Sequence, residues 1–80
     1  MKEIAKERDI LIDTPYIRLD AFLKLTGTAQ TGGQAKILVQ TGRVLVNGQV
    51  CTMRGKKLVA DDRVQAVDED VCYRVKQHDR

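Results

Sequence analysis

The sequence predicts an α+β fold in which a two-helix hairpin packs on a small, mainly antiparallel sheet of about four to five short strands. Two neighbouring segments space their apolar side chains as one face of a helix does. Asn47-Gly48 stands between two apolar runs, which is the strongest short-range signal for a β-hairpin. Residues 63–67 and 71–75 then alternate in polarity, as half-buried strands do.

The first expected element is a short edge strand over residues 10–12, after a flexible start over residues 1–9. The start mixes charged and short apolar side chains without a clear period, which indicates a frayed segment or a short helix. Pro15 ends the strand, because it lacks a backbone donor and biases Thr14 towards an extended conformation.

Two helices are expected next, joined by a short connection. The first has its N-cap at Asp20, ends at Leu25 and has Gly27 just past its end. The second is capped by Thr31 and stops at Gly42, where a left-handed conformation needs no side chain. The core-facing stripes are Leu19, Phe22 and Leu23 on the first helix and Ala35, Leu38 and Val39 on the second.

Gly32 and Gly33 stand in the first turn of the second helix and need an explanation, because an interior glycine costs roughly 1 kcal/mol relative to alanine. One explanation is structural: close packing against the first helix, or a tight turn into the cap. The other is functional, since uncovered amides at the positive end of a helix can approach a phosphate. The spacing matches neither a P-loop nor a dinucleotide fingerprint, so both explanations stay open.

The rest of the chain is expected to form short strands separated by turns. The hairpin pairs residues 44–46 with residues 49–51, and the loop over residues 52–57 carries three cations in four positions. Residues 58–59 are β-prone. In the strand over residues 63–67, Val64 and Ala66 alternate with Arg63, Gln65 and Val67. The last strand can pair with its predecessor and with the first strand, and residues 77–80 are a polar tail.

Charge is unevenly distributed along the chain, although the net charge is only +3. Residues 18–57 hold seven basic side chains and one acidic one, whereas acidic side chains outnumber basic ones before and after this segment. Such segregation is typical of a nucleic-acid-binding surface. A solvated face whose charges happen to cluster would give the same pattern.

Length and composition favour one small domain, residues 10–76, because so short a chain buries only about 60% of its unfolded surface. No apolar run approaches the ~18 residues of a membrane span, and no signal peptide is evident, so we expect a cytoplasmic protein. Cys51 and Cys72 lack the spacing of a metal or redox site and are expected to be packed or half-buried thiols. We expect no catalytic residues, no metal, no cofactor and no small-molecule substrate.

Several motifs resemble the S-four RNA-binding domain, the module named after small-subunit ribosomal protein four. Arg18-Leu19-Asp20-x-x-Leu23 resembles the opening helix of that family. Thr31-x-x-x-Ala35-Lys36-x-x-Val39-x-x-Gly42-x-Val44-x-Val46-Asn47-Gly48 resembles its second helix and hairpin. Asp62-x-Val64 resembles its late Gly-Asp-x-Val turn. The strings Phe22-Leu23-Lys24-Leu25, Gly32-Gly33-Gln34-Ala35-Lys36 and Arg54-Gly55-Lys56-Lys57-Leu58 resemble its small stand-alone bacterial members.

Two positions depart from the family pattern. Many members have Ser/Thr-Arg at the start of the second helix, with that Arg on the RNA face, whereas the matching position here is Gly32. At the late turn Asp61 stands where Gly is usual, and Asp tolerates left-handed conformations. The resemblance implies the helix hairpin on a small sheet and a surface that binds RNA.

We therefore expect a non-catalytic protein that binds structured RNA, ribosomal or transfer RNA, with the ribosome as a possible partner. A helix or junction is favoured over a single strand, because one Phe, two Tyr and no Trp offer few platforms for base stacking. The alternative is a protein-interaction or ribosome-assembly module that uses the same basic patch on an acidic protein. The expected RNA-binding residues are Arg18, Lys24, Thr31, Gly32, Gly33, Gln34, Lys36, Gln40, Arg43, Asn47, Arg54, Lys56 and Lys57.

Overall fold

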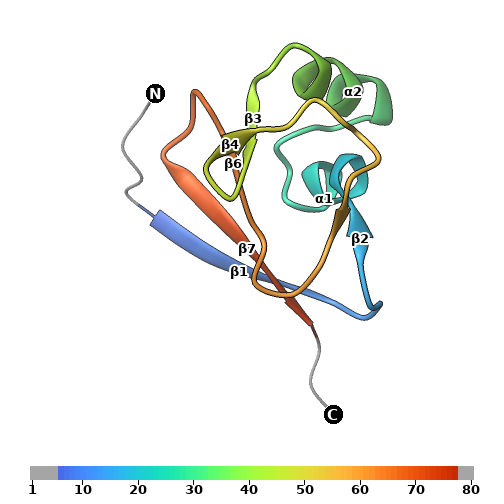
Figure 1. Cartoon of the computed structure of the whole chain (residues 1–80), viewed down its shortest axis with the longest axis vertical. Coiled ribbons are helices and arrows are strands. Elements are labelled where there is room, and N and C mark those ends of the chain that lie inside the picture. The colour runs from blue at the N-terminus through green and yellow to red at the C-terminus, as the bar shows by residue number, and fades with distance from the viewer. Residues whose placement is uncertain (1–5, 78–80) are drawn as a thin grey trace.

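The computed structural model describes residues 6–77, which form two helices beside a five-stranded sheet (Figure 1). The helices are α1 (Leu19–Leu25) and α2 (Gly32–Gln40). The strands are β1 (Lys6–Ile12), β2 (Ile17–Arg18), β3 (Val44–Val46), β4 (Gln49–Val50), β5 (Lys57–Leu58), β6 (Arg63–Ala66) and β7 (Val71–Gln77). The large sheet has the order β1-β7-β6-β3-β4, and β2 pairs with β5 in a separate two-stranded sheet. The predicted α+β class and mainly antiparallel sheet are confirmed, since among the described strands only β1 and β7 pair in parallel.

The N-terminal strand is longer than predicted. It lies at the edge of the sheet, as expected, but it begins at Lys6 and pairs with β7 along its whole length. The expectation of a flexible start or short helix is therefore wrong for residues 6–9, and residues 1–5 lie outside the described part. The cause is non-local, because β7 supplies the backbone partners and no period in the local sequence shows them. At the other end Gln77 belongs to β7 rather than to a tail, and residues 78–80 are not described.

Helix α1 begins at Leu19, so the prediction of Asp20 as its N-cap is wrong. Arg18 occupies the N-cap position and makes no side-chain cap bond. Instead, the amides of Leu19 and Asp20 donate to the carbonyls of Lys56 (2.8 Å) and Arg54 (3.0 Å). The loop after β4 thus accepts hydrogen bonds from two of the N–H groups that have no partner within the helix.

Helix α2 has the two ends that the sequence predicts. The Thr31 hydroxyl accepts a hydrogen bond from the Gln34 amide at 3.0 Å, and the Gln34 side chain in turn accepts one from the Gln30 amide at 2.8 Å. At the far end Gly42 has φ +78°, and the Arg43 amide donates to the Leu38 carbonyl at 3.1 Å. This hydrogen bond, with Gly42 in the left-handed conformation, forms a Schellman motif. The motif ends the helix and directs the chain into β3.

The predicted hairpin turn at Asn47-Gly48 is confirmed. Both residues have positive φ, +53° and +84°, as a two-residue type I′ turn requires. The turn leads β3 into β4, where Leu45 lies opposite Val50. Asp61, which replaces the family glycine, also has positive φ, +76°.

The core lies between the helix pair and one face of the sheet. It joins Phe22, Leu23, Ala35 and Val39 of the helices to Val44, Val64 and Val75 of the strands. The simple alternation predicted for β6 is wrong at Gln65, which is only 6% exposed although it points to the outer face. That face also buries Leu45 and Cys72, and the Gln65 amide donates to the Glu69 carbonyl at 3.2 Å.

Candidate nucleic-acid interface

Four of the expected binding residues converge on one hollow, which we call the cationic pocket. It has a volume of about 270 Å³ and is lined by Arg18, Asp20, Ala21, Lys24, Gly32 and Arg54. These residues come from α1 and its N-cap, from the start of α2 and from the loop after β4. Three segments that are separate in the sequence therefore build one basic depression.

The loop that carries Arg54 is held against α1 by backbone and side-chain contacts. Its carbonyls accept the first two amides of α1, as described above, and the Arg18 guanidinium lies over Gly55. A Cβ added to Gly55 would lie 3.4 Å from a guanidinium nitrogen, an ordinary van der Waals distance, so the guanidinium packs directly against this part of the loop. The same guanidinium pairs with the Asp20 carboxylate at 3.2 Å. Arg18 thus helps to fix the loop as well as to line the pocket.

Asp20 is a pocket residue that the sequence did not identify as part of the site. Its side chain is 20% exposed, and its two oxygens contact the Arg18 guanidinium and the Ala21 amide, the latter at 2.8 Å. It is the single acidic residue of the basic segment 18–57, and it neutralises one of the seven cations there. Its position two residues after Arg18 in the sequence is the signal that could have indicated this pair.

The exposed face of α2 carries Gly32, Gly33, Lys36 and Gln40. A Cβ on Gly32 would meet nothing within 4 Å, and one on Gly33 would meet only the Thr31 hydroxyl at 3.9 Å. The explanation of these glycines by close packing against α1 is therefore wrong. Neither has positive φ, so the fold gives no steric reason for the missing side chains.

Several expected binding residues have structural partners. Thr31 and Gln34 form the cap of α2. The side-chain oxygen of Asn47 accepts a hydrogen bond from the backbone amide of Arg63 at 3.0 Å. The side-chain amide of Asn47 donates one to the Asp62 carboxylate at 3.1 Å. Arg43 lies beyond the end of α2, with its guanidinium 4.0 Å from the Asp68 carboxylate.

The remaining two expected residues lie beside the cationic pocket rather than in it. Lys56 and Asn47 line a second hollow of about 380 Å³ between the β3–β4 hairpin and the following loop. The Lys57 ammonium lies 4.8 Å from the centre of the Tyr16 ring. Some of the expected residues thus line the cationic pocket, and others line a second hollow that shares no residue with it.

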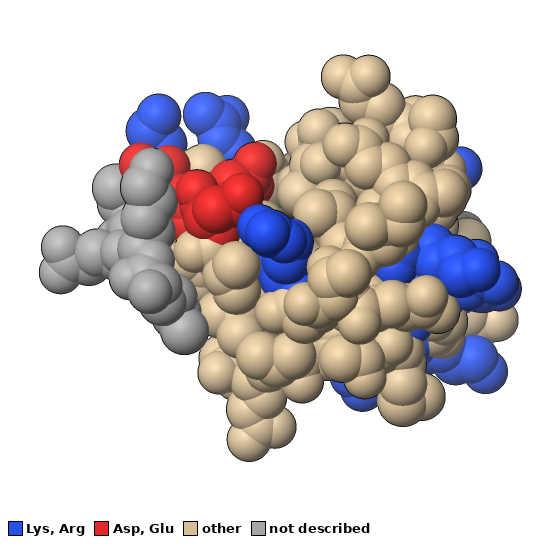
Figure 2. All heavy atoms as spheres, turned by 90° about the horizontal axis from the view of Figure 1, so that it is seen from above, with Lys and Arg blue, Asp and Glu red and all other residues tan. Residues whose placement is uncertain are grey.

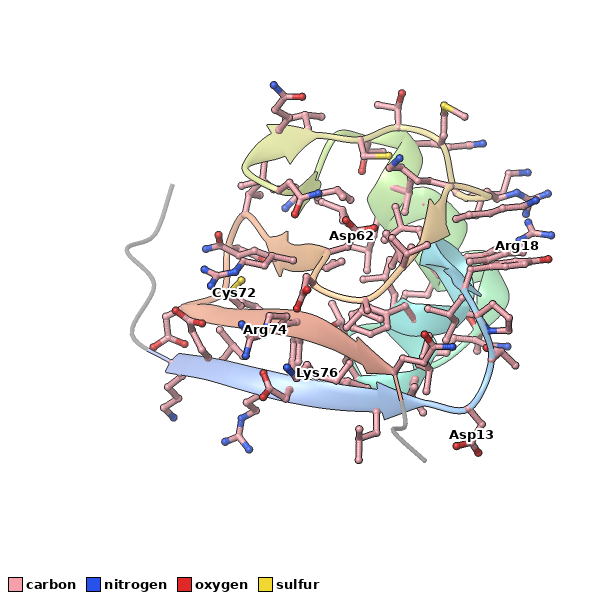
Figure 3. The ribbon with its side chains drawn as sticks, turned by 60° about the horizontal axis from the view of Figure 1, so that its bottom comes forward. Asp13, Arg18, Asp62, Cys72, Arg74 and Lys76 are labelled. Atoms are coloured by element: carbon pink, nitrogen blue, oxygen red, sulfur yellow. The ribbon has the colours of Figure 1, made fainter. Side chains whose placement is uncertain are left out.

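The charges are separated in space as they are in sequence. On the face shown in Figure 2, Asp and Glu side chains at the left lie next to basic ones, whereas the Lys and Arg side chains at the right have no acidic neighbour in view. Figure 3 places Arg18 at the opposite end of the molecule from Cys72, with Arg74 and Lys76 along β7. The basic end is the one formed by the helix pair and the loop that contacts it.

Other chemistry is limited in the part of the chain that the structure describes. No group of three or more His, Cys, Asp or Glu side chains there could hold a metal ion. None of the helices in residues 6–77 has the length and apolarity to cross a membrane. Cys51 is half-buried and Cys72 buried, as predicted, and burial raises the pKa of the Cys72 thiol above its ordinary value.

Fold and surface together define a small α+β domain that presents a cationic pocket between a helix hairpin and a loop. The sequence matches the S4 domain family over residues 10–76, so the chain belongs to this family, as the S-four motifs predicted. Its organisation as a helix hairpin on a mainly antiparallel sheet is the one the resemblance implied.

Three comparisons with individual proteins agree with this assignment. The chain is 45% identical over 56 residues to the "Probable ribosome maturation protein RlbA" of Bacillus subtilis, covering 70% of this chain and 79% of the relative. It is 39% identical over 57 residues to YbcJ of Escherichia coli, covering 71% and 81%. The solution structure of E. coli YbcJ, described as containing an αL motif involved in RNA binding, matches with a TM-score of 0.61 and 33% identity over 95% of this chain and 91% of that one.

Proposed function

We propose that this protein binds structured RNA, ribosomal or transfer RNA, through the cationic pocket and the basic side chains around it. The observation that carries the proposal is the convergence of Arg18, Lys24 and Arg54 on one hollow whose rim includes the open backbone of Gly32. Membership of the S4 domain family and the RNA-binding description of the YbcJ structure support the ligand class.

Phosphate groups are the main expected targets. Among the described residues, Lys24, Lys36, Arg54 and Lys56 have no carboxylate within ion-pair distance. Cations that have no internal partner can neutralise phosphates and release the counterions condensed on the RNA. Because A-form helices are read mostly through shape, phosphates and 2′-hydroxyls, such a surface favours a helix or junction over a defined base sequence.

A ribosomal RNA is the favoured target within this class, because the RlbA relative carries the name of a ribosome maturation protein. The competing function is a protein-interaction or assembly module that places the same basic patch on an acidic protein. Ribonuclease treatment of ribosomal particles distinguishes the two: RNA binding predicts release of the protein, whereas a protein partner predicts that it stays bound.

A salt titration with a purified RNA hairpin tests the proposal directly. If about four to six phosphates are contacted, log Kd should change with log salt concentration with a slope of magnitude roughly 3 to 5. The double variant Lys56→Glu and Lys57→Glu should weaken binding, and Lys76→Glu on β7 is the control. Salt-independent binding, or a double variant that binds as the wild type does, would contradict the proposal.

A further inference from the structure

Tyr16 is the exposed aromatic residue of the described chain. This residue precedes β2 and is 44% exposed, whereas Phe22 is fully buried and Tyr73 packs against the core. Single exposed apolar residues are common on protein surfaces and need no function by themselves. What distinguishes Tyr16 is its surroundings, which link it to the cationic pocket.

The backbone at Tyr16 is held in place on both sides. Pro15 precedes it, and the Thr14 hydroxyl donates to the Tyr16 carbonyl at 2.6 Å. Ile17, the next residue, pairs with Leu58 in the two-stranded sheet. An aromatic ring on a fixed backbone loses little conformational entropy when a ligand covers it, since only its two side-chain torsions must be ordered.

Lys57 connects the ring to the cationic pocket. Its ammonium lies 4.8 Å from the ring centre, within the range of a cation–π interaction. In the β2–β5 pair Lys57 lies directly opposite Arg18, which lines the pocket. An RNA strand whose phosphates enter the cationic pocket can therefore extend past Arg18 and Lys57 to the Tyr16 ring.

Aromatic rings next to cations are the features that bind unpaired nucleotides, because the ring stacks on a base while the cation meets the flanking phosphate. Other exposed apolar side chains, such as Val50 and Met53, offer no planar surface for stacking. The sequence predicted few stacking platforms. Among the aromatic side chains of residues 6–77, Tyr16 is the exposed one, and it lies at the edge of the basic surface.

We propose that Tyr16 and Lys57 form a subsite for one unpaired nucleotide of the bound RNA. The base stacks on the part of the Tyr16 ring that Lys57 leaves exposed, and Lys57 and Arg18 contact the adjoining phosphates. The inference rests on the proposed RNA binding and deepens it: the preferred ligand is an RNA helix with an unpaired nucleotide, as at a bulge or junction.

The test compares two short RNA hairpins that differ by a single unpaired adenosine in the stem. The wild type and Tyr16→Phe should bind the bulged hairpin at least about fivefold more tightly than the fully paired one, the lower end of what one stacked base contributes. Tyr16→Ala should lose this preference while its affinity for the paired hairpin stays unchanged. Val59→Ala, which removes an exposed apolar side chain beside β5, is the matched control and should keep the preference.

A second measurement reports stacking directly. With 2-aminopurine at the unpaired position, its fluorescence should fall on binding to the wild type and to Tyr16→Phe but not to Tyr16→Ala. Thermal unfolding of each variant, followed by circular dichroism, establishes that the compared proteins are folded.

The outcomes separate the two proposals. If neither hairpin binds the wild type, RNA binding itself is refuted. If both hairpins bind with equal affinity, or if Tyr16→Ala weakens both equally, RNA binding stands and the nucleotide subsite is refuted. A loss of preference in Tyr16→Phe would also overturn it, because the ring and not the hydroxyl is proposed to act.

Discussion

The two ends of the molecule differ in how their charged side chains are paired. On the sheet side, Arg74 pairs with Asp9 at 3.2 Å and Arg63 with Glu7 at 3.7 Å. The hydrogen bond to Asp9, and then its charge, raises the pKa of Arg74. These pairs join β1 to strands more than fifty residues away in the sequence, so the charges neutralise one another between neighbouring strands.

On the helix side, Arg18 pairs with Asp20 and Arg43 lies 4.0 Å from Asp68. The other five cations of segment 18–57 have no carboxylate within ion-pair distance among the described residues. Where acidic partners lie on adjacent strands, the basic residues contribute to the internal structure. Where they are missing, the cations stay available to an anion from outside the chain.

The largest effect is expected from reversing charge in the cationic pocket. Lys24→Glu with Arg54→Glu should weaken binding of an RNA hairpin by about a hundredfold and lower the slope of log Kd against log salt by about two, because two phosphate contacts are lost. Filter binding at several salt concentrations measures both quantities.

The matched control puts the same charge change on the sheet side, in Arg8→Glu with Lys76→Glu. Neither residue has an ion-pair partner among the described residues, so folding should tolerate the change. If the control weakens binding as much as the pocket variant does, net charge and not the pocket determines affinity.

Variants of Asn47 test whether this residue stabilises the fold or contacts RNA. Asn47→Ala should lower the free energy of unfolding by about 2 kcal/mol, because it removes the hydrogen bonds to Arg63 and Asp62 and because alanine tolerates the left-handed φ of +53° less well than asparagine does. Asn47→Gly keeps the left-handed conformation and should cost about 1 kcal/mol, which isolates the side-chain contribution. Urea denaturation measures both. Normal stability combined with weaker RNA binding would instead assign Asn47 to the interface.

Gly32 and Gly33 allow stability and binding to be separated. Alanine at both positions should stabilise the protein by up to about 1 kcal/mol, because both sites have space and helical geometry. If the open amides contact a phosphate, RNA affinity should fall at the same time. Thermal unfolding and binding are measured on the same samples; tighter or unchanged binding would show that the amides take no part.

The smallest effect is expected from the two thiols, one in each region. Cys72 should react with a maleimide more slowly than the half-buried Cys51, since burial restricts access and raises the Cys72 pKa. The neutral Cys72 thiol supports stability below the ordinary thiol pKa, and this contribution is lost as pH rises through the raised value. Cys51→Ser and Cys72→Ser identify each labelled site by mass spectrometry. Equal labelling rates would show that the outer face of the sheet opens readily.

The local signals in the sequence predicted the second helix and the hairpin well. The Thr31 cap, the stop at Gly42 and the turn at Asn47-Gly48 depend on neighbours a few residues away, and the structure has all three. The same reasoning failed at Asp20 and at residues 6–9, because their partners are the loop after β4 and the strand β7. For the candidate site, the sequence selected the basic residues but not their grouping.

The sequence by itself determined the fold class, the family and the excess of cations in residues 18–57, because each can be recognised from short-range spacing or composition. Only the tertiary structure decided which of these cations share a hollow, because the loop after β4 must first dock on the start of α1. It likewise decided that Arg43 meets Asp68, that Asn47 holds a turn and that Tyr16 lies beside Lys57. Such groupings depend on contacts between distant segments, for which a single sequence carries no local signal.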